Sequence, residues 1–167
     1  MYVTKHPFLG CFLCQVELQL TTSSGDYGDL DISILPACRR NPGYDETVYA
    51  RPLWGWIQLD LGESFDINDI KLWHYISAGR IYHDVVVQVS NDPTFTTKTT
   101  VFNNDTDNSA GQGIGTDAEY TETSSGKDIP FAITNARYVR LWVNGCNLNA
   151  FSHYVELEVW APPVTTP

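Results

Sequence analysis

The sequence of 167 residues has no long apolar run, little helix-forming composition and no excess of positive charge. Since no run of about 18 apolar residues occurs, no segment is predicted to cross a bilayer as a helix. Methionine occurs once, and no amphipathic helical period extends over about ten residues. Twenty acidic against ten basic side chains give a net charge of −10. Nucleic-acid binders carry a basic surface instead, so neither nucleic acid nor membrane is a predicted partner.

Motifs of phosphate-binding loops, nucleophile elbows and zinc proteases are also missing. The pairs His74-Tyr75 and His153-Tyr154 supply acid–base chemistry, but neighbouring residues of one strand point to opposite faces. A jelly-roll polysaccharide lyase or hydrolase is therefore the least favoured interpretation, and we predict a protein that is not itself an enzyme.

Cysteine is scarce and irregularly spaced. The four cysteines are Cys11, Cys14, Cys38 and Cys146, and they allow three disulfide pairings among which the sequence does not choose. Cys11 and Cys14 could begin a zinc or redox site, but zinc needs two further ligands at close spacing. Buried thiols or one structural disulfide is the prediction.

The sequence is rich in short segments in which apolar and polar residues alternate. These are QVELQL (15–20), WIQLDLG (56–62), DVVVQVS (84–90), YVRLWVNG (138–145) and YVELEVW (154–160). Segments rich in Gly, Asn, Asp and Ser separate them, which predicts an all-β fold, an antiparallel β-sandwich of the jelly-roll type. The length suits one domain, predicted at 1–161, and the Pro- and Thr-rich residues 162–167 are predicted to begin a linker.

Three stretches of the sequence, which include four of these segments, carry a resemblance to a known family. WIQLDLG with the following IxxIKL (56–72), GRIYHDVVVQVS (79–90) and ARYVRLWVNG leading to YVELEVW (136–160) resemble the factor 5/8 type C, or discoidin, domain. The carbohydrate-binding modules of family 32 are the most similar members. The resemblance covers residues 54–161, and residues 1–50 match poorly. It implies an eight-stranded antiparallel jelly roll, ligands at loops on one end, and in many members a structural calcium ion.

Two loops are expected to form the ligand site, because each follows the same end of its strand. They are 74–80 and 144–153, and they carry aromatic rings for the face of a sugar ring and amide, guanidinium and imidazole groups for its hydroxyls. The candidate residues are His74, Tyr75, Arg80, Asn144, Asn147, Asn149, Phe151 and His153. Arg80 has an alternative role in an internal ion pair with Asp84. Galactose-binding members carry an Arg and an Asn that the short loop HYISAGR (74–80) does not hold, so a galactose preference is not predicted.

The resemblance also implies metal ligands. Glu156 and Val155 stand where such modules hold calcium, and Asp45 and Thr47 lie in the nearest equivalent of their early calcium loop, which departs from the family pattern. Asp105 and Asp107 form a second candidate, since their spacing is that of a calcium loop, but the Gly and Glu expected of an EF-hand are out of place. The alternative for Asp105 and Asp107 is a solvated loop without metal. The alternative for Glu156 is a strand residue that only faces solvent.

Together these observations predict a non-catalytic carbohydrate-binding module that targets an attached enzyme or surface protein to a polysaccharide. The predicted module is extracellular and monomeric, and a covalently linked catalytic domain is its predicted companion. The alternative is a discoidin-like adhesion or protein-interaction domain without glycan. Protruding Leu or Phe side chains beside basic residues are typical of lipid-binding relatives, whereas the amide-rich loops of this sequence favour sugar binding. The identity of the sugar and the part played by residues 1–50 stay open.

Overall fold

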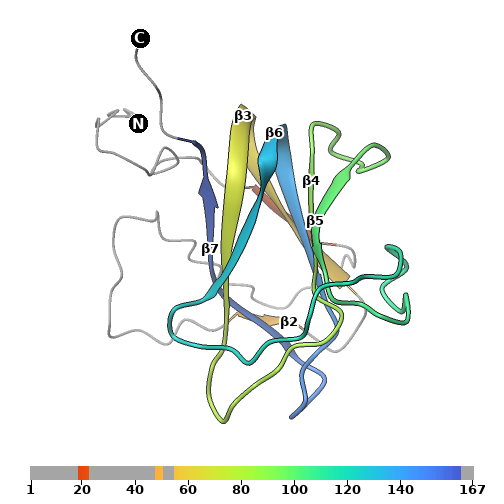
Figure 1. Ribbon diagram of the computed structural model, residues 1–167, viewed down its shortest axis with the longest axis vertical. Coiled ribbons are helices and arrows are strands. Elements are labelled where there is room, and N and C mark those ends of the chain that lie inside the picture. Colours follow the sequence, from red (N-terminus) through yellow and green to blue (C-terminus); the bar gives the residue numbers. More distant parts are fainter. Residues whose placement is uncertain (1–18, 23–47, 51–54, 163–167) are drawn as a thin grey trace.

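The computed structural model describes residues 19–22, 48–50 and 55–162 of the protein. These residues form seven strands and no helix (Figure 1). The strands are β1 (Gln19–Thr22), β2 (Val48–Ala50), β3 (Gly55–His74), β4 (Val86–Ser90), β5 (Thr99–Asn103), β6 (Lys127–Val143) and β7 (Ser152–Trp160). All paired strands are antiparallel, which confirms the predicted class, while the count of eight strands lies beyond what these residues test. None of the described residues belongs to a helix suited to crossing a membrane.

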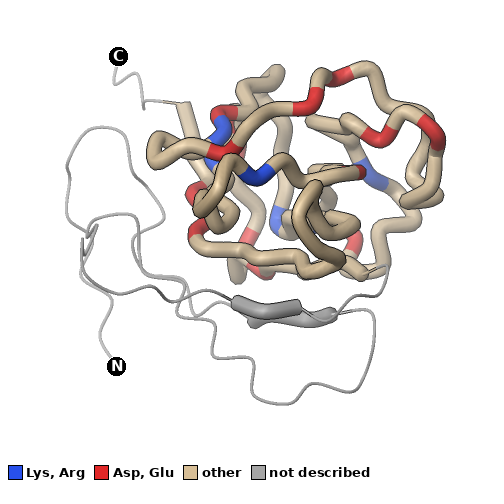
Figure 2. Tube along the Cα trace, turned by 90° about the horizontal axis from the view of Figure 1, so that it is seen from below, with Lys and Arg blue, Asp and Glu red and all other residues tan. Residues whose placement is uncertain are grey.

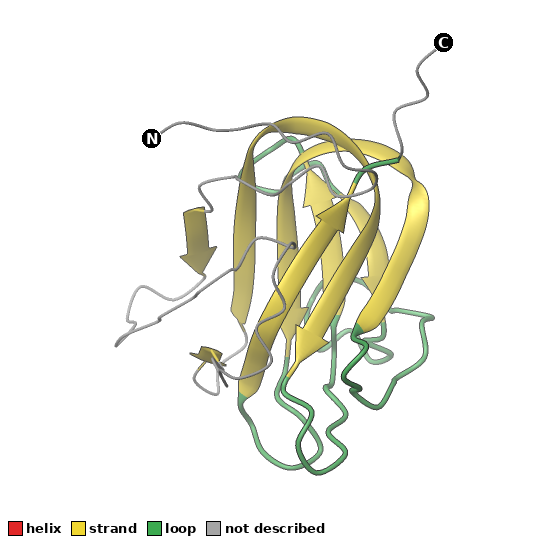
Figure 3. Cartoon of the chain, turned by 90° about the vertical axis from the view of Figure 1, so that its left-hand side faces the viewer, coloured by secondary structure: helices red, strands yellow, loops and turns green. Residues whose placement is uncertain are grey.

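Two long strands connect the layers of the sandwich. The sheet order is β2-β7-β3-β6-β4-β5, and β1 pairs with β3. β3 and β6 bend over at one end, so that their halves lie in facing layers (Figures 1 and 3). The pairing of β3 with β6 shifts register between Asp60 and Phe65, where Gly62 has a φ of 82° that favours glycine. The bend therefore occurs where the alternating segment WIQLDLG ends.

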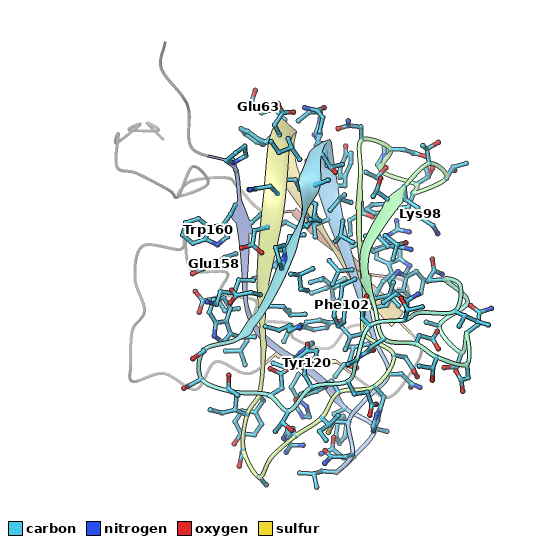
Figure 4. All side chains as sticks on the ribbon, viewed as in Figure 1. Glu63, Lys98, Phe102, Tyr120, Glu158 and Trp160 are labelled. Carbon is cyan, nitrogen blue, oxygen red and sulfur yellow. The ribbon has the colours of Figure 1, made fainter. Side chains whose placement is uncertain are left out.

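The core lies between the two layers and consists of the predicted apolar stripes. Val139 and Leu141 of β6 are 0% and 2% exposed, and Val87 of β4 is fully buried. Burial of each such side chain contributes about 1.5–3 kcal/mol, so the stripes stabilise the sandwich along its length. Toward the loops, Phe102 and Tyr120 (Figure 4) pack edge to face with ring centroids 6.0 Å apart.

Three long connections gather at one end of the sandwich, the lower end in Figures 1 and 3. They are residues 75–85 between β3 and β4, 104–126 between β5 and β6, and 144–151 between β6 and β7. Glu63, at the bend of β3, lies at the opposite end (Figure 4). Backbone hydrogen bonds join the connections, among them Glu122 N to Arg80 O at 2.9 Å. The loop end is therefore one connected surface, where the candidate residues are found.

Candidate functional site

The loops 74–80 and 144–153 lie against each other, as their places after the strands predicted. The amide of Tyr75 donates to the carbonyl of His153 at 3.1 Å, and the amide of Asn147 donates to the carbonyl of Ile81 at 2.9 Å. The side-chain Oδ1 of Asn147 accepts from the amide of Ile81 at 3.1 Å. Asn149 accepts from the amide of Phe151 at 3.0 Å. The two asparagine side chains therefore hold the loops in place, and Asn147 is exposed while Asn149 is half-buried.

Aromatic rings and one guanidinium group form the surface of this loop pair. The guanidinium carbon of Arg80 lies 5.1 Å from the ring centroid of Tyr75. The rings of Tyr75 and Phe151 each lie 6.0 Å from the ring of His153. Phe151 is 41% exposed, so a ligand can reach it from solvent. We call Tyr75, Arg80, Asn147, Asn149 and Phe151 the loop surface.

Both candidate histidines lie beneath that surface. His74 is 1% exposed and His153 is 2% exposed, which places them where they support the loops. Nδ1 of His74 lies 2.7 Å from Oε1 of Glu122, and both side chains are fully buried. The ring of Tyr82 stacks on His74 at 4.3 Å, and its hydroxyl is hydrogen-bonded to Nδ1 of His153 at 2.9 Å. We call His74, Tyr82, Glu122 and His153 the buried floor.

Burial sets the protonation behaviour of the floor. It raises the pKa of the Tyr82 hydroxyl above its ordinary value, so that this group remains protonated. Burial, followed by the positive charge of Arg80, lowers the pKa of His153. The neutral imidazole is thus the favoured form of His153.

The remaining candidate, Asn144, lies away from the loop surface. Its Nδ2 donates to Oδ2 of Asp84 at 2.9 Å, and Ser109 Oγ donates to the same oxygen at 3.0 Å. Arg80 donates instead to Sγ of Cys146 at 3.2 Å, and no ion pair joins Arg80 to Asp84 in the described part of the chain. The ion-pair alternative for Arg80 is therefore wrong.

Three acidic side chains form a separate cluster. Carboxylate oxygens of Asp84, Asp105 and Asp107 lie within 4.8 Å of one another and could hold a metal ion. Asp105 is fully buried and accepts hydrogen bonds from the amides of Ser109 at 3.0 Å and Ala110 at 2.7 Å. Sequence reasoning found Asp105 and Asp107 but missed Asp84. Asp84 lies in a bend two residues before β4, and no local pattern of the sequence links it to Asp105.

The other predicted metal ligands are only partly described. Glu156 and Val155 lie on β7, where Glu156 is opposite Trp73 of β3 and Val155 is 40% exposed. Asp45 and Thr47 lie outside the described residues, as do Cys11, Cys14 and Cys38. Cys146 is a buried free thiol.

An antiparallel β-sandwich with a cluster of aromatic, amide and guanidinium groups on the loops at one end belongs to the class of β-sandwich binding modules. The family model described as "NedA-like, galactose-binding domain", of the F5/F8 type C group, matches residues 51–141. The chain belongs to this family. The resemblance found in the sequence is thereby confirmed.

Solved structures of similar fold come from carbohydrate-active proteins. The family 32 module of AlyQ in complex with 4,5-unsaturated mannuronic acid is 18% identical, with a TM-score of 0.60, and the match covers 91% of this chain and 98% of that one. A truncated AlyQ with its family 32 module and alginate lyase domains is 19% identical, with a TM-score of 0.61, over 89% of this chain and 33% of that one. CpGH89CBM32-5 from Clostridium perfringens, in complex with GalNAc-β-1,3-galactose, is 20% identical, with a TM-score of 0.59, over 89% and 99%.

These likenesses show a fold shared with carbohydrate-binding modules, which are non-catalytic. Comparison with curated protein sequences finds no match.

Proposed function

We propose that the protein is a glycan-binding module whose ligand lies on the loop surface. The observation that carries this proposal is the exposed ring of Phe151 beside the Arg80–Tyr75 pair and two loop asparagines. Aromatic rings stack on the apolar face of a pyranose, and amide and guanidinium groups hydrogen-bond its hydroxyls. The ligands named for the similar modules, an unsaturated mannuronic acid and GalNAc-β-1,3-galactose, support this function.

The buried floor gives the loop surface a fixed shape before a ligand arrives. His74 and Glu122 connect the end of β3 to the long connection before β6, and Tyr82 connects the first loop to His153. A loop that is already ordered loses little conformational freedom on binding. The site is open to solvent and buries little area, so its intrinsic affinity is modest.

A module of modest affinity acts by holding an attached partner near its substrate. Tethering raises the effective concentration of that partner, and no new contact is needed for the gain. The AlyQ chain, which contains both a family 32 module and alginate lyase domains, supports an attached catalytic domain. The proposed protein is extracellular and monomeric, and its own β-sandwich performs no catalysis.

The first test is affinity electrophoresis of the whole chain in gels that contain neutral or acidic polysaccharides. Phe151→Ala is expected to weaken binding roughly two- to tenfold, since stacking on an aromatic ring contributes about 0.5–1.5 kcal/mol. Ile133→Ala is the control, because Ile133 is an apolar side chain, 63% exposed, on β6 outside the loops. Absence of retardation by every polysaccharide would refute glycan binding.

An adhesion or protein-interaction domain is the second candidate. The observation that favours it is the exposure of apolar side chains on the same loops, with Ile76 42% and Leu148 50% exposed. Such residues can enter an apolar pocket of a protein partner. Under this alternative the double change Ile76→Ser and Leu148→Ser abolishes binding to a partner, whereas glycan retardation is absent from the start.

Calcium is proposed as a structural ion of this module. The donors of Asp84, Asp105 and Asp107 suit a hard cation, which prefers carboxylate and carbonyl oxygens. Glu156 and Val155 on β7 are the other proposed position for the ion. Thermal melting with calcium and with chelator tests the ion, and the variants Asp105→Asn and Glu156→Gln identify the position. An identical midpoint with and without calcium would contradict the proposal.

A further inference from the structure

Arg80 stands apart from the other arginines that the structure describes. Arg137 makes two hydrogen bonds to the carboxylate of Asp60, at 2.6 and 2.8 Å. Arg140 donates to Oε1 of Gln58 at 2.6 and 3.0 Å and to a backbone carbonyl at 3.2 Å. Arg80 has no oxygen acceptor within the described residues, and its one hydrogen bond goes to Sγ of Cys146. A thiol is a weak acceptor, so this guanidinium is poorly satisfied.

The donor groups of Arg80 differ in their surroundings. Nη1 donates to Sγ of Cys146, whereas Nε is buried. Among the residues that the structure describes, neither Nε nor Nη2 has a hydrogen-bond partner. Tyr75 covers the guanidinium, as its ring centroid lies 5.1 Å away. The cation–π contact stabilises the positive charge and orients the plane, but it offers no acceptor to the N–H groups. The arrangement holds a guanidinium ready for an acceptor that arrives from outside.

The positive charge of Arg80 is not neutralised locally. No carboxylate oxygen of the described residues lies within 4.0 Å of its nitrogens. Its charge reaches the neighbouring imidazole of His153, whose pKa it helps to lower. Figure 2 looks onto the loop end and shows Lys and Arg positions interspersed among Asp and Glu. An uncompensated cation in a chain of net charge −10 is an exception that points to an anionic ligand.

We propose that the sugar bound at the loop surface carries a carboxylate, and that Arg80 receives it. This inference rests on the proposed function and names the class of its ligand as uronic-acid polysaccharides. The planar guanidinium matches a carboxylate in shape, and a charge-assisted hydrogen bond is roughly twice as strong as a neutral one. The acidic surface elsewhere hardly opposes the approach of an anionic polymer, because charges more than about 8 Å apart are largely screened at physiological ionic strength.

The test compares polymers that differ only in the carboxylate. Polymannuronate and polygalacturonate are measured beside their carboxyl-reduced, neutral forms, by affinity electrophoresis and calorimetry at physiological salt. A tenfold or greater preference for the uronate form is expected. Arg80→Gln should reduce the preference by weakening uronate binding about ten- to hundredfold, the effect of one hydrogen bond to a charged group. Binding of the neutral form should weaken less, because only a hydrogen bond to an uncharged hydroxyl is lost. Lys98→Gln removes the same charge outside the loop surface, next to β5, and should change neither affinity (Figure 4).

Each other result has a distinct meaning. Equal affinity for uronate and reduced polymers overturns the carboxylate assignment and leaves glycan binding intact. Preference for dextran sulfate over dextran without preference for a uronate overturns it as well, in favour of a sulfated ligand. Failure to bind any of these polymers overturns the uronate assignment, and failure with every neutral and acidic polysaccharide of the first test refutes the proposed function itself. Because the comparison of polymers uses the unaltered chain, a folding defect in Arg80→Gln cannot mask the outcome. Arg80→Lys keeps the positive charge but removes the planar guanidinium, so it distinguishes the effect of charge from that of the paired N–H donors.

Discussion

Two histidine–glutamate contacts have the same length but differ in burial, so they allow the effect of burial on the stabilising energy of such a contact to be tested. Nδ1 of His74 lies 2.7 Å from Oε1 of Glu122, and Nδ1 of His83 lies 2.7 Å from Oε1 of Glu119. The side chains of the first pair are 0% exposed, and those of the second are 39% and 51% exposed. Glu119 and Glu122 belong to one connection, so Glu122→Ala and Glu119→Ala change the same segment in two environments.

The expected losses of stability differ severalfold. Glu122→Ala leaves the ring of His74 buried without its acceptor, which costs about 3–5 kcal/mol for a broken buried ion pair. Glu119→Ala removes a solvated contact and should cost less than about 1 kcal/mol. Each kcal/mol moves the melting temperature of a domain of this size by about 2–4 °C. Glu122→Ala is therefore expected to lower the midpoint by about 6–20 °C, and Glu119→Ala by at most about 4 °C.

Urea unfolding, followed by tryptophan fluorescence, measures both free energies. Glu122→Gln is the conservative variant, since its amide oxygen accepts from His74 and should recover part of the loss. Similar midpoint shifts for Glu122→Ala and Glu119→Ala would refute the reasoning that burial makes the first contact a structural one. Full stability of Glu122→Ala would show that the floor does not hold the loops.

Three further predictions concern the loop end and the ionisable groups. Gly145→Ala should destabilise the protein more than Gly79→Ala, although both glycines have a φ of 65°, because an added Cβ meets loop backbone within 3.0 Å at Gly145 and nothing at Gly79; chemical unfolding measures both. Stability should fall as the pH drops below 6.5, the ordinary pKa of His153, because its pKa is lowered in the folded state and the unfolded chain takes the proton first, and His153→Asn should flatten that slope. Hydrogen bonds from Arg137 lower the pKa of Asp60, so ionised Asp60 contributes to the free energy of unfolding above pH 3.8, and this contribution is lost as the pH falls through the pKa of the folded state. Arg137→Gln should therefore make the free energy of unfolding less sensitive to acid, which urea unfolding at a series of pH values measures.

The layers of the sandwich were predictable because strand alternation is a local property. The same alternation predicts that His74 is buried, because it follows Ile70 and Leu72 at a period of two and shares their face. We instead assigned His74 to the ligand site because it begins a polar loop. His153 could not be placed in this way, since a register shift between Trp73 and His74 breaks the alternation of the partner strand and buries both His153 and Tyr154.

The contacts of the loop end depend on pairings between distant segments. Glu122 reaches His74 across 48 positions, and Tyr82 reaches His153 across 71. No local pattern marks either partner, because a glutamate or tyrosine in a loop is ordinarily solvated. The carboxylate at Asp84 joins Asp105 through the pairing of residues 85 and 104, where Val85 O accepts from the amide of Asn104 at 3.1 Å.

The ion pair between Arg80 and Asp84, which the sequence allowed as an alternative, is not formed in the described part of the chain, and this separates two candidate sites. Asp84 has a φ of 54°, a left-handed conformation, and its carboxylate contacts Asn144 and Ser109 on the side of the acidic cluster. Arg80 lies toward the other loop pair, over Tyr75. Had the two charges met, they would have neutralised each other and left neither a cation for an acidic sugar nor a third carboxylate for a metal ion. Their separation by the turn between them creates one positive and one negative site on the same loop end, so the proposed uronate and calcium would bind without competing for a side chain.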